Sequence, residues 1–218
     1  MIIGLTGKNG SGKGEVARFL RERGFEYLSL SDVIRRELVK RKKRLTRENL
    51  VAQGNELRKK FGPDVLAKRT VEQMEMEKNY VVDSIRHPAE AKALKAHNGF
   101  ALLNVTAPPK VRFERLRARG RENDPRTFGE FKKLERTEGG SSVRSDQQLD
   151  RTIGLADYSV RNAGTLKELE DEVTRIVMAI ARKKKTPELG RIFFRHCKSR
   201  RAQVQLRQAK SSRRHRQR

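Results

Sequence analysis

The sequence predicts an α/β protein in which a five-stranded parallel sheet is covered by helices on both faces. Two observations support this fold class. An apolar stretch beginning at Ile2 leads into a glycine-rich loop, and residues 15–20 then show the apolar spacing of a helix. Apolar stretches of strand length also alternate with helical stretches as far as residue 180, which is typical of a parallel sheet with crossover helices.

The size and composition of the chain favour one domain with an extension. It has 218 residues, enough to bury an ordinary core, and its single cysteine, Cys197, excludes an internal disulfide framework. No apolar stretch approaches transmembrane length, and the N-terminus lacks the pattern of a signal segment. We therefore expect a cytoplasmic protein that does not associate with membranes.

The net charge of +25 is concentrated toward the C-terminus. Residues 183–218 contain 14 Lys or Arg and a single acid, Glu188. We therefore expect a folded domain over residues 1–182 and a basic tail, disordered or loosely helical, over residues 183–218. Such a tail would bind nucleic acid weakly and without sequence preference.

The most informative stretch is the run Gly7-Lys8-Asn9-Gly10-Ser11-Gly12-Lys13-Gly14. Its glycines let successive backbone N–H groups curl around a phosphate at the positive end of a helix. Lys13 would add a mobile charge for the outer phosphates. A glycine-rich turn before an ordinary helix would share this pattern, but the order of strand, loop and helix favours phosphate binding.

The residue after the lysine departs from the usual phosphate-loop pattern. A Ser or Thr there would offer a hydroxyl to Mg²⁺, and this chain has Gly14. The metal would then depend on nucleotide oxygens, water and a carboxylate from elsewhere in the chain.

A second strand is predicted over residues 25–30, followed by a helix over residues 31–38. Arg35 would then lie near the carboxyl edge of the sheet, where open α/β sheets bind ligands. A solvent-exposed arginine would have the same spacing. Further helices are expected over residues 46–60 and 65–76.

Residues 80–88 combine an apolar strand with Asp83 and, three residues later, Arg86. This places a carboxylate and a guanidinium at the same sheet edge as the glycine loop. Asp83 could orient the water shell of Mg²⁺, and Arg86 could clamp a phosphate. An Asp that caps the next turn and pairs with the Arg would leave the same pattern. His87 is expected to be a loop residue rather than a catalyst.

The fourth strand is predicted over residues 100–105, before a helix over residues 111–119 that carries Arg115 and Arg119 on one face. These two arginines could embrace a triphosphate or could simply be solvated. Residues 120–151 are polar and rich in glycine, which is typical of a lid.

The remaining elements complete the alternation. A helix is expected over residues 127–136, inside the lid. Residues 156–164 would form a fifth short strand and its loop, and Thr165 would cap a last amphipathic helix.

With these motifs in place, residues 1 to about 180 resemble P-loop nucleotide kinases of the adenylate kinase and dephospho-CoA kinase type. The similarity lies in residues 7–14, 30–35, 82–86, 114–119 and 156–164, which occur in the order expected for that family. The chain departs from it at Glu15, where adenylate kinases have Thr. The resemblance implies a three-layer P-loop kinase fold with a lid, ATP and Mg²⁺ as cofactors, and a nucleotide as phosphate acceptor.

The resemblance also implies roles for individual residues. The expected catalytic residues are Lys13, Asp83 and Arg119, with Asp83 near the metal. The expected acceptor-binding residues are Asp32, Arg35 and Arg86. The expected ATP-binding residues are Gly7, Lys8, Asn9, Gly10, Ser11, Gly12, Lys13, Gly14, Glu15, Arg115 and Asn162.

The closest overall resemblance is to kinase-like domains that precede a zinc-dependent deoxycytidylate deaminase in fused proteins. The chain itself has no His-x-Glu and no Cys-x-x-Cys motif. Back-translation of residues 190–217 permits a frame, shifted by one nucleotide, that resembles the start of such a deaminase, which would make the tail a frameshift product.

Three functions are compatible with these patterns. The first is an ATP-dependent kinase acting on a nucleoside or deoxynucleoside monophosphate, or on dephospho-CoA with Asp32 as base. The second is a nucleotide-sensing regulatory domain without turnover, originally serving a deaminase. The third is nucleic-acid binding through the tail.

Overall fold

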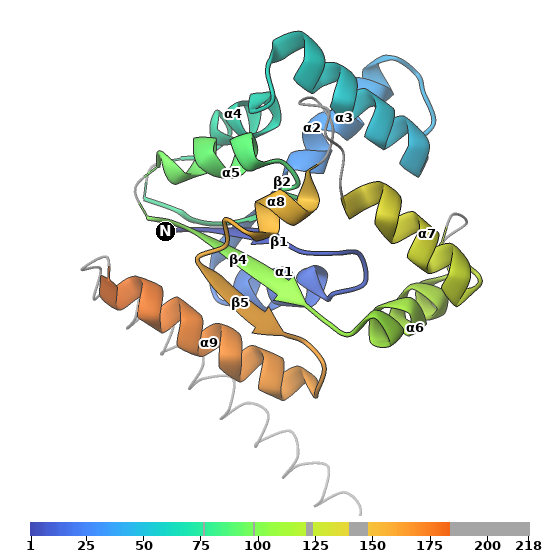
Figure 1. Cartoon of the computed structure of the whole chain (residues 1–218). Coiled ribbons are helices and arrows are strands. Elements are labelled where there is room, and N and C mark those ends of the chain that lie inside the picture. Colours follow the sequence, from blue (N-terminus) through green and yellow to red (C-terminus); the bar gives the residue numbers. More distant parts are fainter. Residues whose placement is uncertain (76, 98, 121–123, 140–147, 184–218) are drawn as a thin grey trace, which may run out of the picture. The chain divides into compact units, whose positions relative to one another are not determined.

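The computed structural model describes residues 1–75, 77–97, 99–120, 124–139 and 148–183 (Figure 1). The chain divides into two units, Met1–Val173 and Thr174–Arg218, and the first unit contains the sheet. The division lies inside the last helix, α9 (Leu166–Lys183), so residues 174–183 are the described part of the second unit. The basic tail predicted over residues 183–218 lies, apart from Lys183, outside the described residues.

A five-stranded parallel sheet organises the first unit, in the order β2-β3-β1-β4-β5. The strands are β1 (Ile2–Thr6), β2 (Phe25–Ser29), β3 (Asn79–Asp83), β4 (Phe100–Thr106) and β5 (Tyr158–Arg161). Because β1 lies between β3 and β4, the glycine loop that follows β1 leaves the sheet at the middle of its carboxyl edge. Ligands of open α/β sheets bind at this edge.

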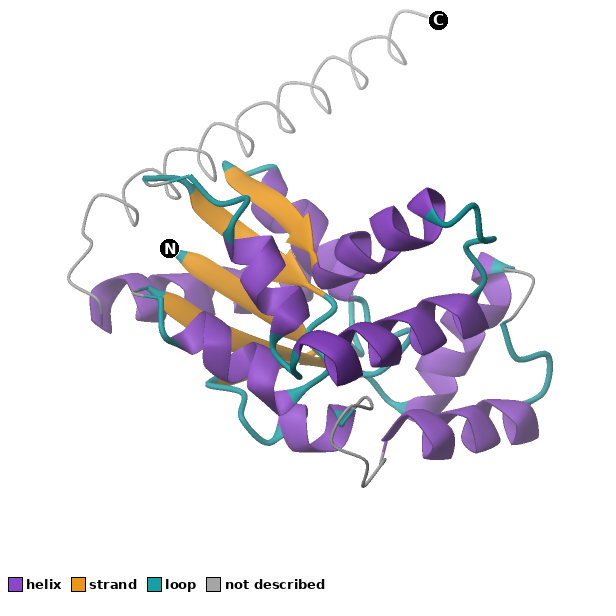
Figure 2. Cartoon of the chain, turned by 90° about the horizontal axis from the view of Figure 1, so that it is seen from above, coloured by secondary structure: helices purple, strands orange, loops and turns teal. Residues whose placement is uncertain are grey.

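Helices cover both faces of the sheet (Figures 1 and 2). In the first unit they are α1 (Lys13–Arg21), α2 (Leu30–Lys40), α3 (Arg47–Phe61), α4 (Val65–Val71), α5 (Pro88–Lys95), α6 (Pro109–Arg119), α7 (Phe128–Gly139), α8 (Leu149–Ile153) and the first part of α9. Helix α1 packs against β1, β2 and β3 behind the sheet of Figure 1, and α5 and α8 lie in front of it. The predicted three-layer α/β fold is confirmed.

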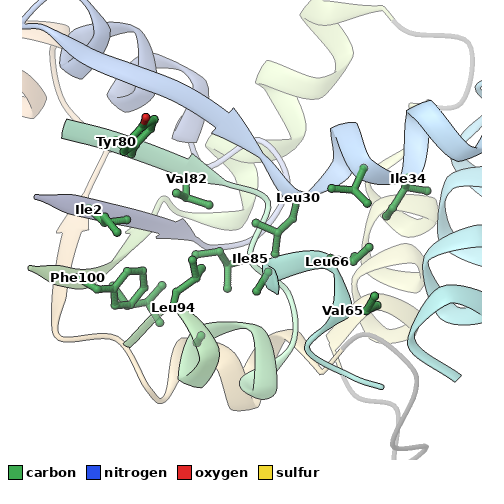
Figure 3. Close-up of a cluster of buried hydrophobic side chains, with 14 of the residues drawn as sticks. Ile2, Leu30, Ile34, Val65, Leu66, Tyr80, Val82, Ile85, Leu94 and Phe100 are labelled. Carbon is green, nitrogen blue, oxygen red and sulfur yellow. The ribbon is translucent and has the colours of Figure 1, made fainter. Parts of the chain in front are cut away.

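The core beneath α5 extends to the carboxyl edge of the sheet (Figure 3). Val82 and Phe100 pack there with Leu94 of α5, and all three are buried. Leu30 and Ile85, which follow the ends of β2 and β3, belong to the same cluster and are 0% and 1% exposed. The turns after these strands are therefore anchored in the core.

Three local predictions are corrected by the structure. Helix α2 begins at Leu30, one residue earlier than predicted, with Ser29 as its N-cap. Helix α4 ends at Val71 and not at residue 76, because the backbone tightens there: the N–H groups of Gln73 and Met74 bond to carbonyls three residues back. Helix α8 was not predicted.

Helix α5 was also not predicted, although His87 itself lies outside it, in a bend, as expected. His87 is the N-cap of α5: its ring accepts a hydrogen bond from the Ala89 N–H, and Glu90 accepts one from the His87 N–H. Pro88 occupies the first helical position, where its missing N–H costs nothing. The expectation that His87 is not a catalyst agrees with this capping role.

The described part of the predicted lid is packed against α6. The rings of Phe113, Phe128 and Phe131 form a cluster with centroid separations of 5.5 to 5.8 Å. Beside them, the buried Arg112 of α6 makes a bidentate ion pair with Glu135 of α7. Residues 121–123 and 140–147 of the lid lie outside the described residues. No helix in the described ranges is long and apolar enough to cross a bilayer.

Candidate active site

The loop between β1 and α1 depends on its glycines. Gly7 and Gly12 have φ angles of 131° and 99°, in the region that favours glycine. A Cβ on Gly7 would lie 2.2 Å from the carbonyl oxygen of Val105, a backbone atom of β4. No other residue fits there, and this close approach brings the loop against the sheet.

Lys13 closes this loop on itself. Its Nζ donates hydrogen bonds to the carbonyl oxygens of Gly7 at 2.7 Å and Lys8 at 3.1 Å. Lys13 also lines the cavity described below, so an anion bound there could exchange these neutral acceptors for a charged one, which binds an ammonium group more strongly.

Two side chains from distant parts of the chain brace the same loop. Asn162, after β5, donates to the Ser11 carbonyl at 2.9 Å, and Arg115 of α6 donates to it at 3.4 Å. Arg115 also donates to the amide oxygen of Asn162 at 3.1 Å. The hydroxyl of Ser11 is buried and has no hydrogen-bond partner among the described residues, which leaves one polar atom of the loop for a ligand or water.

A cavity of about 1080 Å³ opens at this edge of the sheet. Its charged and polar lining residues are Asn9, Lys13, Glu15, Tyr27, Ser31, Arg35, Thr46, Arg47, Asp83, Ser84, Arg86, Arg115, Arg119, Asp124 and Asn162. Its apolar lining residues are Leu30, Ile34, Leu45, Leu50, Val51, Leu66, Leu116, Leu166 and Leu169. Cations outnumber carboxylates in this lining, so the cavity favours anionic ligands. Its volume is at the upper end of the range for ligand sites, roughly 300–1,000 Å³.

Asp83 lies at the end of β3 and is held from two sides. Its Oδ1 accepts the Ser84 N–H at 2.6 Å, and its Oδ2 accepts the Tyr27 hydroxyl at 3.3 Å. Burial, followed by the nearby Asp83 carboxylate, raises the pKa of Tyr27 to about 12, so the phenol stays protonated and remains a donor at neutral pH. The carboxylate is thereby oriented at the cavity wall.

Arg86 is positioned through its backbone. Its N–H and that of His87 both donate to Glu90 Oε2, at 2.9 and 3.0 Å. The other Glu90 oxygen accepts two hydrogen bonds from Arg58 of α3, at 2.9 and 2.8 Å, and the side chains of this pair are 2% and 0% exposed. A buried ion pair thus links α3 to the turn that carries Arg86.

The predicted acceptor-binding residues do not all reach the cavity. Arg35 and Arg86 line it, but Asp32 does not, and its carboxylate accepts a hydrogen bond from the Arg35 guanidinium at 2.6 Å. Arg47, at the start of α3, lines the cavity and was not predicted. The sequence did contain a signal for Arg47: it directly follows Thr46, the N-cap of α3, in a segment rich in cations.

The predicted ATP-binding residues divide in a similar way. Those that line the cavity are Asn9, Gly10, Gly12, Lys13, Gly14, Glu15, Arg115 and Asn162. Gly7, Lys8 and Ser11 belong to the loop but do not line the cavity, and Lys8 instead lies 3.8 Å from Asp150. Arg119 lines the cavity and is paired with Asp124 at 2.5 and 3.0 Å, a carboxylate that the sequence analysis did not single out.

The site fits a nucleotide phosphate better than it fits a metal ion by itself. The glycine loop and Lys13 suit a phosphate. For a metal ion, Gly14 supplies no hydroxyl, and the carboxylate of Glu15 forms an ion pair with Arg18 at 2.8 Å. Within the described ranges, no three His, Cys, Asp or Glu residues gather as a metal cluster. Mg²⁺ would therefore be held by nucleotide oxygens and water, with Asp83 of the cavity lining as a carboxylate donor.

Comparisons with known proteins agree with this geometry. A family model described as an AAA domain matches residues 3–138. A UPF0200 protein from Pyrococcus horikoshii is 35% identical over 187 residues, covering 83% of this chain and 97% of the relative. The chain belongs to the UPF0200 family. Another member, from Thermococcus kodakarensis, is 33% identical over 190 residues, 84% of this chain and 100% of the relative.

Solved structures show the same fold at lower identity. TT1252 from Thermus thermophilus has a TM-score of 0.54 and 23% identity, over 82% of this chain and 97% of that one. A shikimate kinase from Bacteroides thetaiotaomicron has a TM-score of 0.53 and 18% identity, over 83% and 98%. The predicted P-loop kinase-like fold is therefore confirmed. The names of these UPF0200 relatives do not mention a deaminase, so they give no support to the predicted relation to deoxycytidylate deaminase fusions.

Proposed function

We propose that this UPF0200 protein is an ATP-dependent phosphotransferase whose acceptor is a nucleoside or deoxynucleoside monophosphate. The observation that carries the proposal is the cavity, which is lined both by phosphate-loop residues, including Lys13, and by Arg35, Arg47 and Arg86 from other elements. Phosphoryl transfer depends mainly on positioning two phosphates in line and on neutralising their charge. A single cavity whose lining combines the phosphate loop with further cations is suited to that task.

The donor end would use the loop N–H groups and Lys13 for the outer phosphates of ATP. Arg115 and Asn162 would keep the loop in shape, and Arg119 would neutralise charge on the transferring group after leaving Asp124. Mg²⁺, bound with the nucleotide, would supply further charge neutralisation beside Asp83.

The acceptor end combines cations with apolar side chains. Ile34, Leu45, Leu50 and Leu66 line the cavity near Arg35, and such a surface suits a flat base attached to a phosphate. Dephospho-CoA would need a general base for a ribose hydroxyl, and the candidate Asp32 is paired with Arg35 outside the cavity lining. A monophosphate, which already carries its nucleophilic oxygen as an anion, needs no such base.

A nucleotide-sensing domain without turnover, as would serve a deoxycytidylate deaminase-type protein, is the alternative. It is favoured by Gly14 and Glu15, since neither offers the hydroxyl that usually contacts metal or phosphate at these positions. Weak, non-specific binding of nucleic acid by residues 183–218 and a cytoplasmic location stay predictions from the sequence.

The experiment is ADP release from Mg-ATP by the full chain, across ribo- and deoxynucleoside monophosphates and dephospho-CoA. We expect turnover with one class of monophosphate and a loss of about 10² to 10³ in kcat for Lys13→Ala, because a preorganised donor to the transferring phosphate is removed. Lys110→Ala, an exposed lysine on α6, is the matched control. ATP binding without ADP release on any acceptor would refute the kinase and favour the sensor.

A further inference from the structure

The turn after β3 contains a strained residue at the cavity wall. Ser84 has a φ angle of 66°, in the left-handed region that glycine occupies readily and other residues rarely do. A non-glycine residue there is strained and persists only where its surroundings impose that conformation. Ser84 also lines the cavity, between Asp83 and Arg86 in the sequence.

The surroundings do impose this conformation. The Ser84 N–H is bonded to the Asp83 carboxylate at 2.6 Å. The next residue, Ile85, is 1% exposed and belongs to the buried hydrophobic cluster (Figure 3). Both of its backbone groups bond to β1: its N–H donates to the Leu5 carbonyl at 3.3 Å, and its carbonyl accepts from the Thr6 hydroxyl at 3.0 Å. Glycine would satisfy every one of these bonds with less strain, so they do not explain a serine.

The side chain of Ser84 ends a chain of hydrogen bonds that starts at Arg35. The Arg35 guanidinium donates to Ser31 Oγ at 2.7 Å, Ser31 and Ser29 are bonded through their hydroxyls at 2.8 Å, and Ser29 donates to Ser84 Oγ at 3.3 Å. A hydroxyl has one hydrogen to donate. The Ser29 hydroxyl also bonds with the Tyr27 phenol; with Ser29 as the donor to Ser84, Ser31 is the donor to Ser29 and the chain runs in one direction.

This direction leaves the Ser84 hydrogen for the cavity. No hydrogen bond found among the described residues uses the Ser84 hydroxyl as donor, and each bond in such a chain polarises the next. The cation of Arg35 therefore makes the terminal O–H a better donor to an anion. The middle of the chain is shielded from water, because Ser29 is 4% exposed.

We propose that Ser84 is an acceptor-recognition residue, whose hydroxyl donates to an anionic oxygen of the acceptor while the Arg35–Ser31–Ser29 chain orients and polarises it. This inference rests on the proposed function, because it assigns the ligand to the acceptor end of the cavity. Ser84, in the turn after β3, and Arg35 of α2 then contact the same ligand, and the strained conformation of Ser84 serves binding.

Two variants separate the hydroxyl from the strain. Ser84→Ala removes the hydroxyl and keeps the strained φ, whereas Ser84→Gly removes both. We expect both to raise the dissociation constant of the acceptor about tenfold, the loss of one hydrogen bond to a charged group, with the dissociation constant of ATP changed less than twofold. The melting temperature of Ser84→Gly should equal or exceed that of the wild type. Ser29→Ala should raise the dissociation constant of the acceptor by a smaller factor than the Ser84 variants do.

Binding is measured by calorimetry on the full chain with AMP, CMP, GMP, UMP and their deoxy forms, and Ser159→Ala on β5 is the control. Equal acceptor affinity in the wild type and both Ser84 variants, or no binding of any of these nucleotides to the wild type, overturns the inference. So does a loss of affinity in Ser84→Gly accompanied by an equal loss for ATP. Failure of the kinase proposal is seen separately, as acceptor binding by the wild type without ADP release.

Discussion

The buried ion pair between Arg58 and Glu90 should be the costliest polar contact to break in this domain. In Arg58→Met the apolar stem is kept, but Glu90 loses two of its four hydrogen bonds and the cation that faces it. At 0% exposure, water cannot replace them. Removing one partner of a buried pair costs about 3–5 kcal/mol, a large share of the roughly 5–15 kcal/mol that stabilises a domain.

A matched control exists on the surface. Arg41 and Glu56 form the same kind of pair at 2.9 Å, with side chains 39% and 49% exposed. Arg41→Met should cost less than about 1 kcal/mol. Urea unfolding measures both: with an m-value of roughly 1–3 kcal/mol/M, the midpoint for Arg58→Met should fall by at least about 1 M, and that for Arg41→Met by far less.

A double variant shows why the pair is costly. In Glu90→Gln the amide oxygen can still accept the N–H groups of Arg86 and His87, while the charge is gone. Arg58→Met combined with Glu90→Gln should therefore recover most of the lost stability, since no charge is left unpaired. The reasoning is refuted if Arg58→Met and Arg41→Met shift the midpoint equally, or if the double variant is as unstable as Arg58→Met.

The remaining predictions concern the cavity. Gly14→Ser should lower the Mg²⁺ concentration needed for half-maximal nucleotide binding without loss of stability, because a Cβ at Gly14 meets no atom within 4 Å; an Mg²⁺ titration of ATP binding checks this. Asp124→Asn should raise ATP affinity up to about fivefold by releasing Arg119, as calorimetry would show. The raised pKa of Tyr27 means that its phenol stabilises the fold below pH 10 and that this contribution is lost as the pH rises toward 12. A phenolate absorbance titration should therefore show one high-pH transition near pH 12 that is absent in Tyr27→Phe.

The parts of the fold that sequence reasoning could predict are those set by local chemistry. The strand, glycine loop and helix at residues 2–20, and the strands ending near Ser29 and Asp83, follow from apolar spacing and glycine position alone. The same reasoning placed Arg35, Arg86 and Lys13 at one sheet edge, since parallel strands end together.

What could not be predicted depends on which residues meet in space. The pairing of Arg58 with Glu90, 32 residues apart, depends on a tertiary arrangement in which α4 contacts both α3 and α5. Asp32 was expected in the acceptor site because of its position in a motif, but a neighbouring guanidinium engages it. The positive φ of Ser84 has no signature in a serine, because such a conformation is inferred from sequence only where glycine stands.

The backbone carbonyl groups of the phosphate loop are all engaged by hydrogen-bond donors of the protein. Each carbonyl oxygen of residues 7–12 accepts a hydrogen bond, within 3.5 Å, from another group of the protein. Lys13 donates to the carbonyls of Gly7 and Lys8, and the first turn of α1 donates to that of Gly12. The donors to the other three are Arg112 for Asn9, Arg115 for Gly10, and Arg115 with Asn162 for Ser11. Carbonyl dipoles that would repel an anion are thereby engaged by donors, most of them cations.

The cations near this loop therefore have two roles, one in holding the loop conformation and one in binding a phosphate. Arg112 and Arg115 approach the carbonyl side, so they favour the loop shape without occupying the phosphate position, and Lys13 is the one among these three whose contacts a phosphate could replace. Losing Arg112 should therefore weaken nucleotide binding through the loop conformation, and Glu135 of α7 would change it through the same contact. Arg112, a buried arginine of α6, thus contacts both the phosphate loop and α7 of the predicted lid.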